Sequence, residues 1–310
     1  MTQTVIVTGG AGFIGSHLVR RLLADGLRVR VIDNLSTGKR SNLDDVAGDM
    51  TLHEMSFTDL DAIHPIFDGA SLVYHIGALP SVPRSVKDPI ESDYHNTRGT
   101  LNVLVAARDA GVRRVVYAAS SSAYGDTAAH YKVETMPPAP LSPYGVAKLA
   151  GEYYCKAFTA SYGLETVCTR FFNVFGPRQD PDSHYAAVIP KFITMLLNGD
   201  APTIFGDGTQ SRDFTYIDNV LHGLRLAADA PRASGRTVNL AMGGSITLIE
   251  LVEKLNTLLG TEIQPVFLEP RAGDIKHSRA DITLAGELMG YEPVVTFDEG
   301  LQHTVAYYRR

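Results

Sequence analysis

Residues 4–15 read TVIVTGGAGFIG: a short β-branched run breaks into three regularly spaced glycines and continues as an amphipathic helix. In such a unit Gly9 permits the tight turn, Gly12 lets the backbone approach a pyrophosphate, and Gly15 allows the helix to pack on the sheet. The helix N-terminus then offers N–H groups and a positive dipole end to phosphates. The stretch therefore predicts a dinucleotide turn, in which Phe13 and Ile14 also face the cofactor.

A second predicted strand distinguishes a cofactor site from an ordinary tight turn between a strand and a helix. Residues 28–33 read RVRVID, and Asp33 stands 18 residues beyond Gly15. A carboxylate at the end of this strand accepts hydrogen bonds from the adenosine ribose and repels a 2′-phosphate. Because the next residue is Asn34 and not an arginine, the sequence predicts NAD, and not NADP, as the cofactor.

Length and composition are those of an ordinary globular enzyme. The 310 residues are 45% hydrophobic and 20% charged, enough for one large domain and a smaller one. The net charge of −6 gives no overall affinity for nucleic acid. Cys155 and Cys168 are expected to be buried free thiols, and the scattered histidines indicate no metal site. With no apolar run of about 18 residues and no basic leader, we expect a cytoplasmic protein without a membrane partner.

Short apolar strands alternate with longer helical patterns through the first half of the chain. This alternation predicts an α/β fold with a doubly wound parallel sheet of the Rossmann type. We expect strands at 3–8, 28–33, 50–55, 71–75, 114–119 and 165–170, and long helices at 92–110 and 143–161. Residues 1–175 would then form the NAD-binding domain, with some later segments returning to its sheet.

Beyond residue 176 the elements become shorter. We expect helices near 186–198, 216–229, 247–259 and 281–288, with small strands near Thr203 and Thr237. This pattern predicts that residues 176–310 mainly form a smaller α/β cap. Ligands of open α/β sheets bind beyond the carboxyl ends of the strands, so the cap would close over a substrate.

The fifth strand and the helix after it carry the reactive groups. The strand ends in the serines Ser120, Ser121 and Ser122, which places hydroxyls at the ligand edge of the sheet. Tyr144 and Lys148 are four residues apart at a helix start, so both side chains lie on one face. A lysine ammonium beside a phenol favours the phenolate, so we expect Lys148 to lower the pKa of Tyr144. Tyr144 is therefore the candidate proton-transfer residue.

These motifs resemble those of the extended short-chain dehydrogenase/reductase family, and within it the UDP-hexose 4-epimerases. The resemblance covers essentially the whole chain and implies that Ser120, with Ser121 and Ser122 as alternatives, is the catalytic hydroxyl. It also implies a cofactor site with Asp59 toward the adenine, Gly77 and Ala78 along the cofactor, and Asn96 behind the active site. On the sugar side it implies that the uridine diphosphate is held by Asn173, Gly206, Arg212 and Arg271.

The residues that follow the catalytic hydroxyl distinguish the reactions that members of this family catalyse. Similar dehydratases carry an Asp-Glu pair there, and similar UDP-glucuronate decarboxylases carry a glutamate two residues on. In this chain the positions are Ser121 and Ser122. Without an added acid or base, oxidation and reduction at one carbon is the simplest reaction, and we expect 4-epimerisation. The alternatives are a UDP-glucuronate 4-epimerase or decarboxylase, and an NAD-binding sensor or scaffold without catalysis.

By the same resemblance, two segments narrow the choice of substrate among the UDP-sugars. Residues 81–85, including Ser81 and Arg84, and residues 271–278, including Asp274, are similar to those of epimerases of N-acetylated UDP-hexosamines. In the second segment, Ser278 has a small side chain at a position where epimerases restricted to UDP-glucose have a bulky one. A small residue leaves room for the acetamido group without excluding the plain sugar. The resemblance also implies a homodimer, with helices 92–110 and 143–161 in the contact.

Overall fold

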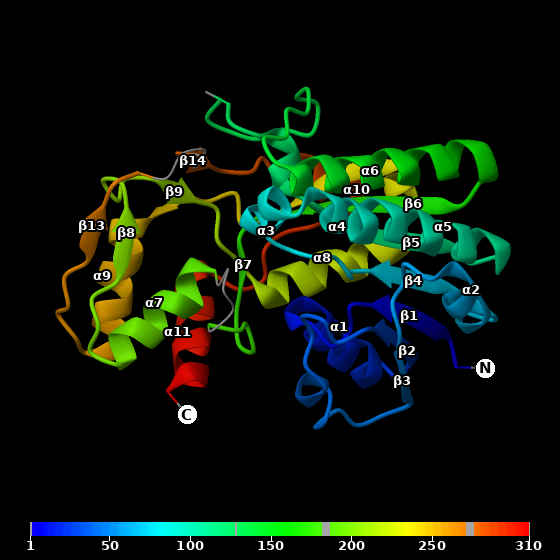
Figure 1. Cartoon of the computed structure of the whole chain (residues 1–310), viewed down its shortest axis with the longest axis horizontal. Coiled ribbons are helices and arrows are strands. Elements are labelled where there is room, and N and C mark those ends of the chain that lie inside the picture. The colour runs from blue at the N-terminus through cyan, green and yellow to red at the C-terminus, as the bar shows by residue number, and fades with distance from the viewer. Residues whose placement is uncertain (1, 128, 182–186, 271–275, 310) are drawn as a thin grey trace.

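The computed structural model describes residues 2–127, 129–181, 187–270 and 276–309. Its centre is a seven-stranded parallel sheet in the order β11-β6-β5-β4-β1-β2-β3 (Figure 1). The strand order reverses between β1 and β4, which is where a doubly wound sheet binds its ligand. The predicted fold class is therefore confirmed. The strands are β1 (Thr4–Thr8), β2 (Arg28–Asp33), β3 (Met50–Glu54), β4 (Leu72–His75), β5 (Arg114–Ser120), β6 (Glu165–Phe171) and β11 (Arg236–Leu240).

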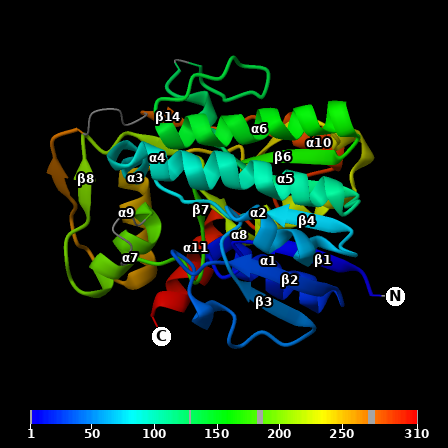
Figure 2. The ribbon, with the colours of Figure 1, turned by 45° about the vertical axis from the view of Figure 1, so that its right-hand side comes forward.

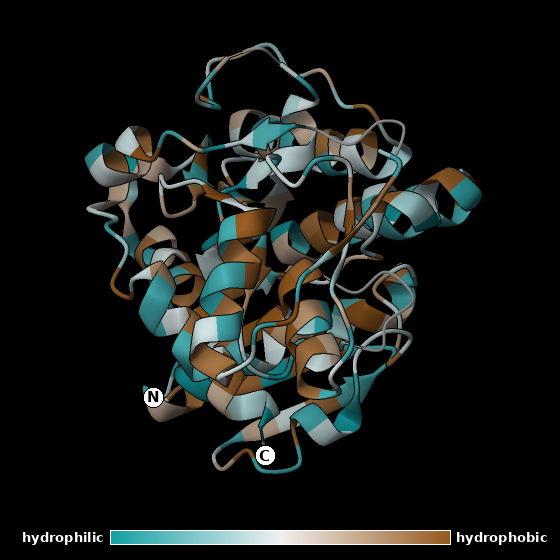
Figure 3. Ribbon diagram, turned by 90° about the vertical axis from the view of Figure 1, so that its left-hand side faces the viewer, coloured by the Kyte–Doolittle hydropathy of each residue, from teal (hydrophilic) through white to brown (hydrophobic). Residues whose placement is uncertain are grey.

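Helices cover both faces of this sheet, which is why its strands are almost continuously apolar. Val5 and Val7 of β1 pack toward α1 (Phe13–Ala24) and α8 (Ile217–Asp229). Ile6 points to the opposite core, with α5 (Gly99–Asp109) and α6 (Pro143–Tyr162). Figure 2 shows these two helical layers on either side of the strands. Apolar and polar segments alternate along the helices (Figure 3), as expected of helices with one face in a core.

The helix expected at 92–110 is interrupted. The structure has α4 (Pro89–Asp93), a π-helical turn η3 (Tyr94–Arg98) and then α5. At the junction Gly99 lies against the Phe57 ring, where a Cβ atom would come within 2.5 Å of ring carbons. A π turn inserts a residue into a helix and often marks a functional site. Asn96 lies in this turn.

The cap lies beside the sheet, on the left in Figure 1. Its helices are α7 (Val188–Leu197), α9 (Leu248–Leu259) and α11 (Phe297–Tyr308), the last of which the sequence did not predict. Its strands form small sheets, whose members are β7 (Val174–Phe175) with β10 (Thr215–Tyr216), β8 (Thr203–Phe205) with β13 (Val266–Leu268), and β9 (Ser211–Arg212) with β12 (Ile246–Thr247) and β14 (His277–Ser278). The boundary at residue 175 stays a prediction.

Three late elements lie against the main sheet and not in the cap. The strand near Thr237, expected in the cap, is β11, which pairs with β6 from Arg236 to Leu240. Helix α8 packs on β5 and β6, and α10 (Thr283–Met289) packs on β11. The assignment of the Thr237 strand to the cap was therefore wrong, because a short buried strand has the same pattern in either place.

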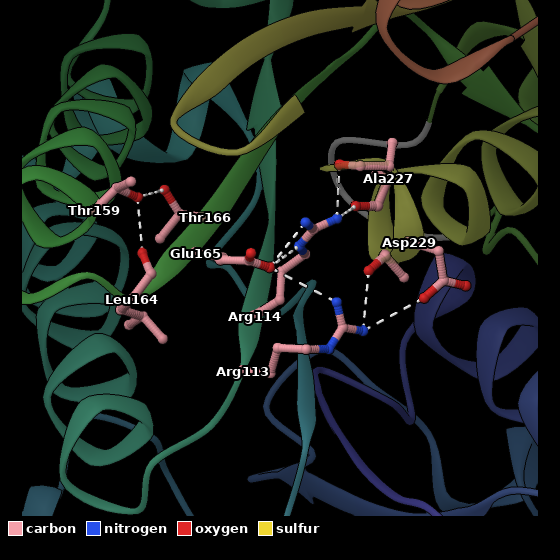
Figure 4. Close-up of polar contacts among 10 residues, drawn as sticks. Arg113, Arg114, Thr159, Leu164, Glu165, Thr166, Ala227 and Asp229 are labelled. Atoms are coloured by element: carbon pink, nitrogen blue, oxygen red, sulfur yellow. Dashed lines mark hydrogen bonds and ion pairs between the residues drawn. The ribbon is translucent and has the colours of Figure 1, made fainter. Parts of the chain in front are cut away.

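Two arginines fasten α8 to the sheet at the edge opposite the glycine turn (Figure 4). The Arg114 guanidinium is 1% exposed; it pairs with Glu165 at 2.8 Å and donates to the carbonyls of Ala227 and Ala230 at 2.9 Å. Arg113 donates to the Ala228 carbonyl at 3.2 Å. Cations suit the unpaired carbonyls of a helix C-terminus. These bonds fix the C-terminal end of α8 to the sheet before the chain enters β11.

Short elements complete the chain. They are α2 (Leu60–Ile63), α3 (Val82–Lys87) and the 3₁₀ turns η1 (Arg40–Asn42), η2 (His64–Phe67), η4 (Ser121–Tyr124) and η5 (Pro231–Ala233). Among the described residues, no helix is both long and apolar enough to cross a membrane.

Candidate active site

A pocket of about 1020 Å³ opens at the carboxyl edge of the sheet, between the sheet and the cap. It gathers most of the residues expected to hold a dinucleotide. Its wall includes Gly9, Gly12, Phe13, Ile14, Gly15, Asp33, Asn34, Gly77, Ala78, Ser81, Arg84, Tyr144 and Lys148. Most of these positions follow the ends of β1, β2 and β4, which the parallel topology brings to one edge, and α6 adds Tyr144 and Lys148.

The glycine turn is built for close approach. Gly9 has a φ of +68°, and a Cβ atom on it would lie 2.6 Å from the Gly77 Cα atom. A Cβ atom on Gly15 would lie 2.1 Å from the Gly9 carbonyl oxygen. Helix α1 begins at Gly12 without a side-chain cap, so the N–H groups of its first turn are available to a pyrophosphate. The turn therefore fits the dinucleotide that the sequence predicts.

Asp33 closes the loop that would surround the adenosine ribose. One carboxylate oxygen accepts from the Ala11 N–H at 2.9 Å, and the other accepts from the Leu35 N–H at 2.8 Å. Burial raises the pKa of Asp33, while these two bonds oppose the rise. Each oxygen keeps a second lone pair that can accept from a ribose hydroxyl. Asn34 accepts from Ser36 and so shapes the same loop.

Ser120 and Tyr144 form the reactive pair. Ser120 acts on the Tyr144 phenol, whose pKa it lowers against the larger and opposite effect of burial. Ser120 also accepts from the Ser122 hydroxyl at 2.8 Å and from the Ser122 N–H at 3.2 Å. Since its oxygen already accepts two bonds, the Ser120 hydrogen is directed elsewhere, toward the phenol or a substrate oxygen. Helix α6 presents Tyr144 in its first turn, after an N-cap by Ser142.

The expected influence of Lys148 on Tyr144 is not seen. Burial raises the pKa of Tyr144 to about 12, and the opposing effect comes from Ser120. The Lys148 ammonium donates to the Ala118 carbonyl at 2.8 Å and lies 4.9 Å from the Tyr117 ring centroid. Burial lowers the pKa of Lys148 to about 8. The prediction that Lys148 lowers the pKa of Tyr144 was wrong for the protein alone, because desolvation outweighs any attraction.

Two residues expected at the cofactor lie outside the pocket wall. Asp59 is exposed and caps α2, where it accepts from the Ala62 N–H at 3.1 Å. The nearby pocket residue is Phe57. Asn96 is buried behind the wall, where it accepts from the Leu79 N–H at 2.8 Å and donates to the Leu79 carbonyl at 3.0 Å. Asn96 therefore supports the wall without lining it.

The residues expected at the uridine diphosphate are spread over the cap sheets. Arg212 and Ser278 are direct partners in the β9–β14 pair, and Arg212 donates to the Ser211 carbonyl at 2.9 Å. Asn173 has a φ of +33° and donates to the Asp213 carbonyl at 3.2 Å. Gly206 follows β8. None of these four lines the described part of the pocket, so their substrate roles stay predictions; Arg271 and Asp274 lie outside the described residues.

The sequence missed the segment 177–181, which crosses the pocket between the two halves of the molecule. Arg178 pairs with Asp45 at 2.8 Å, and Asp180 pairs with Lys39 at 2.8 Å. The Tyr308 hydroxyl of α11 donates to the Gln179 carbonyl. Nothing in the local sequence indicated these contacts, because each joins segments far apart in the chain.

Ser81 is a strained member of the wall. Its φ is +104°, an unusual value for a residue with a side chain, and its hydroxyl caps α3 by accepting from the Arg84 N–H at 3.2 Å. Backbone strain of this kind gathers at ligand sites.

Among the described residues, no group of three His, Cys, Asp or Glu side chains could hold a metal ion.

The sheet, the glycine turn and the Tyr144–Lys148 pair define an NAD-binding enzyme of the extended short-chain dehydrogenase/reductase class. Residues 5–241 match the model of the NAD dependent epimerase/dehydratase family. The chain belongs to this family.

Three relatives are similar over nearly their whole length. The UDP-glucose 4-epimerase of Mycolicibacterium smegmatis is 38% identical over 98% of both chains. A solved UDP-N-acetylglucosamine 4-epimerase from Methanobrevibacter ruminantium, in complex with UDP-N-acetylmuramic acid, is 40% identical, with a TM-score of 0.95 over 100% of this chain and 99% of that one. A UDP-glucuronic acid 4-epimerase from Bacillus cereus, with UDP-glucuronic acid and NAD, is 31% identical, with a TM-score of 0.92 over 99% of both chains.

Proposed function

We propose that this protein is a UDP-sugar 4-epimerase that interconverts UDP-N-acetylglucosamine and UDP-N-acetylgalactosamine. One observation carries the proposal: Tyr144 lines the pocket, Ser120 acts on its phenol, and the described carboxylates of the pocket wall are engaged elsewhere. Among the described residues of the wall the carboxylates are Asp33, which holds the loop after β2, and Asp180, which pairs with Lys39. Dehydration or decarboxylation of the family type needs a further acid or base, whereas epimerisation does not.

The reacting groups act at the sugar C4 hydroxyl. Tyr144 removes the hydroxyl proton, and Ser120 donates its hydrogen to the same oxygen and stabilises the charge that develops there. NAD, when bound, supplies the hydride acceptor that makes the 4-keto sugar and the donor that reduces it. The sugar turns between the two steps, so the second reduction occurs on its other face. Tyr144 then returns the proton.

Lys148 holds the positive charge of the site. Its ammonium is fixed by the Ala118 carbonyl, and it lies one helical turn from Tyr144. A fixed ammonium there can donate to the nicotinamide ribose and so orient the cofactor. Burial raises the pKa of Tyr144 to about 12, and the effect that opposes burial comes from Ser120.

The N-acetylated substrate rests on narrower support. Ser278 is small and 8% exposed, and it is the direct strand partner of Arg212, which we assign to the diphosphate. A side chain of this size leaves room for an acetamido group. The similarity to the Methanobrevibacter ruminantium enzyme agrees with this substrate, while the Mycolicibacterium smegmatis relative suggests that UDP-glucose is also accepted.

The test is to incubate the purified enzyme separately with UDP-N-acetylglucosamine, UDP-glucose and UDP-glucuronate, and to separate the products by chromatography. We expect the C4 epimer of the N-acetylated sugar as the main product. Faster conversion of UDP-glucuronate, or release of carbon dioxide from it, would support the glucuronate alternatives instead. Firm NAD binding without conversion of any sugar would support a non-catalytic NAD-binding protein.

We also propose a homodimer through the two helical segments expected to form it, which are α4, η3 and α5 in the first segment and α6 in the second. Ile90, Tyr94 and Tyr153 are 81%, 51% and 54% exposed, which is unusual for large apolar side chains on neighbouring helices. An Ile90→Asp variant should sediment as a monomer. Val294→Asp, at an apolar site that is 58% exposed and lies outside these helices, is the control and should leave the dimer intact. A monomeric wild type would contradict this proposal.

A further inference from the structure

His75 ends β4 behind the cofactor wall, and it is 1% exposed. Its Nδ1 atom lies 2.7 Å from the Thr8 hydroxyl oxygen, and its Nε2 atom lies 3.0 Å from the Thr100 hydroxyl oxygen. The mechanism above does not use this imidazole. Both ring nitrogens are nevertheless engaged, and both partners are themselves bonded.

The directions of these bonds fix where the ring proton lies. The Thr100 hydroxyl donates to the Asn96 carbonyl at 2.6 Å, so its single hydrogen is used and it must accept from His75 Nε2. The Thr8 oxygen accepts from the Gly77 N–H at 3.1 Å, which leaves its hydrogen to donate to His75 Nδ1. Every donor in this chain of bonds then has an acceptor. His75 is neutral in this arrangement, with its proton on Nε2.

The chain of bonds holds one stretch of the pocket wall at two points. At one end the Thr8 hydroxyl binds the N–H of Gly77, which lines the pocket. At the other end the Asn96 side chain binds both backbone groups of Leu79, which also lines the pocket. His75 joins the two ends. If the proton of the His75 ring moved to the other nitrogen, these hydrogen bonds would break and the wall at residues 77–79 would loosen.

The same ring faces the cation of the site. Tyr117 of β5 is 5.5 Å from the His75 ring centroid, its ring lies 4.9 Å from Lys148 Nζ, and its hydroxyl donates to the Lys148 carbonyl at 3.3 Å. Burial lowers the pKa of His75 to about 3, and the charge of Lys148 on α6 adds a smaller effect in the same direction. Tyr117 stays protonated, because burial raises its pKa. A neutral His75 adds no second positive charge beside Lys148.

We propose that His75 is a positioning residue, held as the neutral Nε2-protonated tautomer, which fixes the wall at residues 77–79 against the bound cofactor. The proposal rests on the NAD site and not on the identity of the sugar. A failure of the sugar assignment would leave it untouched.

The first test compares three variants by the rate at which NAD leaves the holoenzyme. Thr100→Val removes the acceptor of the Nε2 proton, and we expect NAD release to become about tenfold faster. Thr100→Ser restores a hydroxyl and should return the rate close to that of the wild type. Thr97→Val is the matched control, since the Thr97 hydroxyl is buried in the same turn and bonds to no described residue. Equal release rates in Thr100→Val and Thr97→Val would overturn the proposal.

The second test needs no variant that folds poorly. In the wild-type holoenzyme with ¹⁵N-labelled histidine, nitrogen shifts report the tautomer and charge of each ring, and His75→Gln assigns the signal. We expect one protonated nitrogen, Nε2, unchanged from about pH 5 to about pH 8, where an ordinary histidine titrates. A proton on Nδ1, or a titration within that range, would overturn the proposal whether or not the enzyme converts UDP-sugars.

Discussion

The cofactor end and the sugar end of this molecule are built in different ways. At the cofactor end, β1 is buried at all five positions, and one continuous stretch forms the strand, the glycine turn and the start of α1. At the sugar end, β9 and β14 have two residues each, and they join Ser211 to His277, 66 residues along the chain. All three residues of β13 are exposed.

This difference between the two ends indicates where the protein tolerates amino-acid substitutions. A turn fixed by close backbone contacts, such as Gly15 against Gly9, permits almost no substitution. A sheet of two-residue strands with exposed neighbours has few packed atoms to disturb, so a substitution there alters the shape of a pocket more than the fold. We therefore expect variants at the cofactor end to change whether the enzyme works, and variants at the sugar end to change which sugar it uses.

The largest effect is expected from Tyr144→Phe, at the junction of the two ends. The variant keeps the ring and loses the proton acceptor, so kcat should fall by roughly 10²-fold or more. NAD should remain bound, because the glycine turn is unchanged. Steady-state kinetics and the absorbance of bound cofactor measure the two effects, and near-normal turnover would rule out Tyr144 as the base.

Ser278→Tyr probes the sugar end. Added bulk in a defined pocket commonly costs about 1–3 kcal/mol, so kcat/KM for the N-acetylated sugars should fall roughly 10-fold to 100-fold. UDP-glucose should be affected much less, and the fold should survive. Ser211→Ala, on the neighbouring strand, is a control for damage to the sheet itself. Equal losses for both sugar classes would mean that Ser278 has a structural role.

Asp33→Asn tests the adenosine end of the pocket. The wild-type protein, stripped of cofactor, should bind NAD at least about tenfold more tightly than NADP, because the carboxylate repels a 2′-phosphate. The amide removes this repulsion, so the two affinities should approach each other. Isothermal titration calorimetry measures both affinities. If the wild type bound NAD and NADP equally, Asp33 would not face the ribose.

The smallest effect is in the pH profile. Because the pKa of Lys148 is lowered to about 8, its ammonium is lost as the pH rises through that value, and kcat should decline above it. The effect has this sign because the protonated form is the useful one. Tyr144 acts oppositely, since a higher pH favours its phenolate. A kcat that rises steadily beyond about pH 8 would show that the charge on Lys148 is not needed.

The comparison also explains what could be predicted from the sequence. The glycine turn, Asp33 and the Tyr144–Lys148 pair follow from local spacing, and the structure brings all of them to one pocket. Their energetics could not be predicted in this way, because the pKa of Tyr144 depends on burial by distant segments. Likewise, the π turn that interrupts the helix at 92–110 occurs where Gly99 must pass the Phe57 ring.

A strand and a carboxylate show what local sequence leaves open. The strand at Arg236–Leu240 is apolar in the manner of any buried strand, and only its pairing with β6 shows that it belongs to the main sheet. Asp59 follows a strand as an adenine contact would, yet its carboxylate caps α2. For the strand a long-range pairing decided its place, whereas the Asp59 cap is a local contact and the contact of Asp59 with the cofactor stays a prediction.

The central claim is that hydride leaves C4 and returns to C4 within a closed site that adds no other acid or base. We would measure it by running the reaction to equilibrium in D₂O with UDP-N-acetylglucosamine and recording the product by proton NMR. We expect the epimer to carry no deuterium at C4 or C5, because hydride passes through the cofactor and not through solvent. Deuterium at either carbon would show that a proton is exchanged there, and would contradict the account.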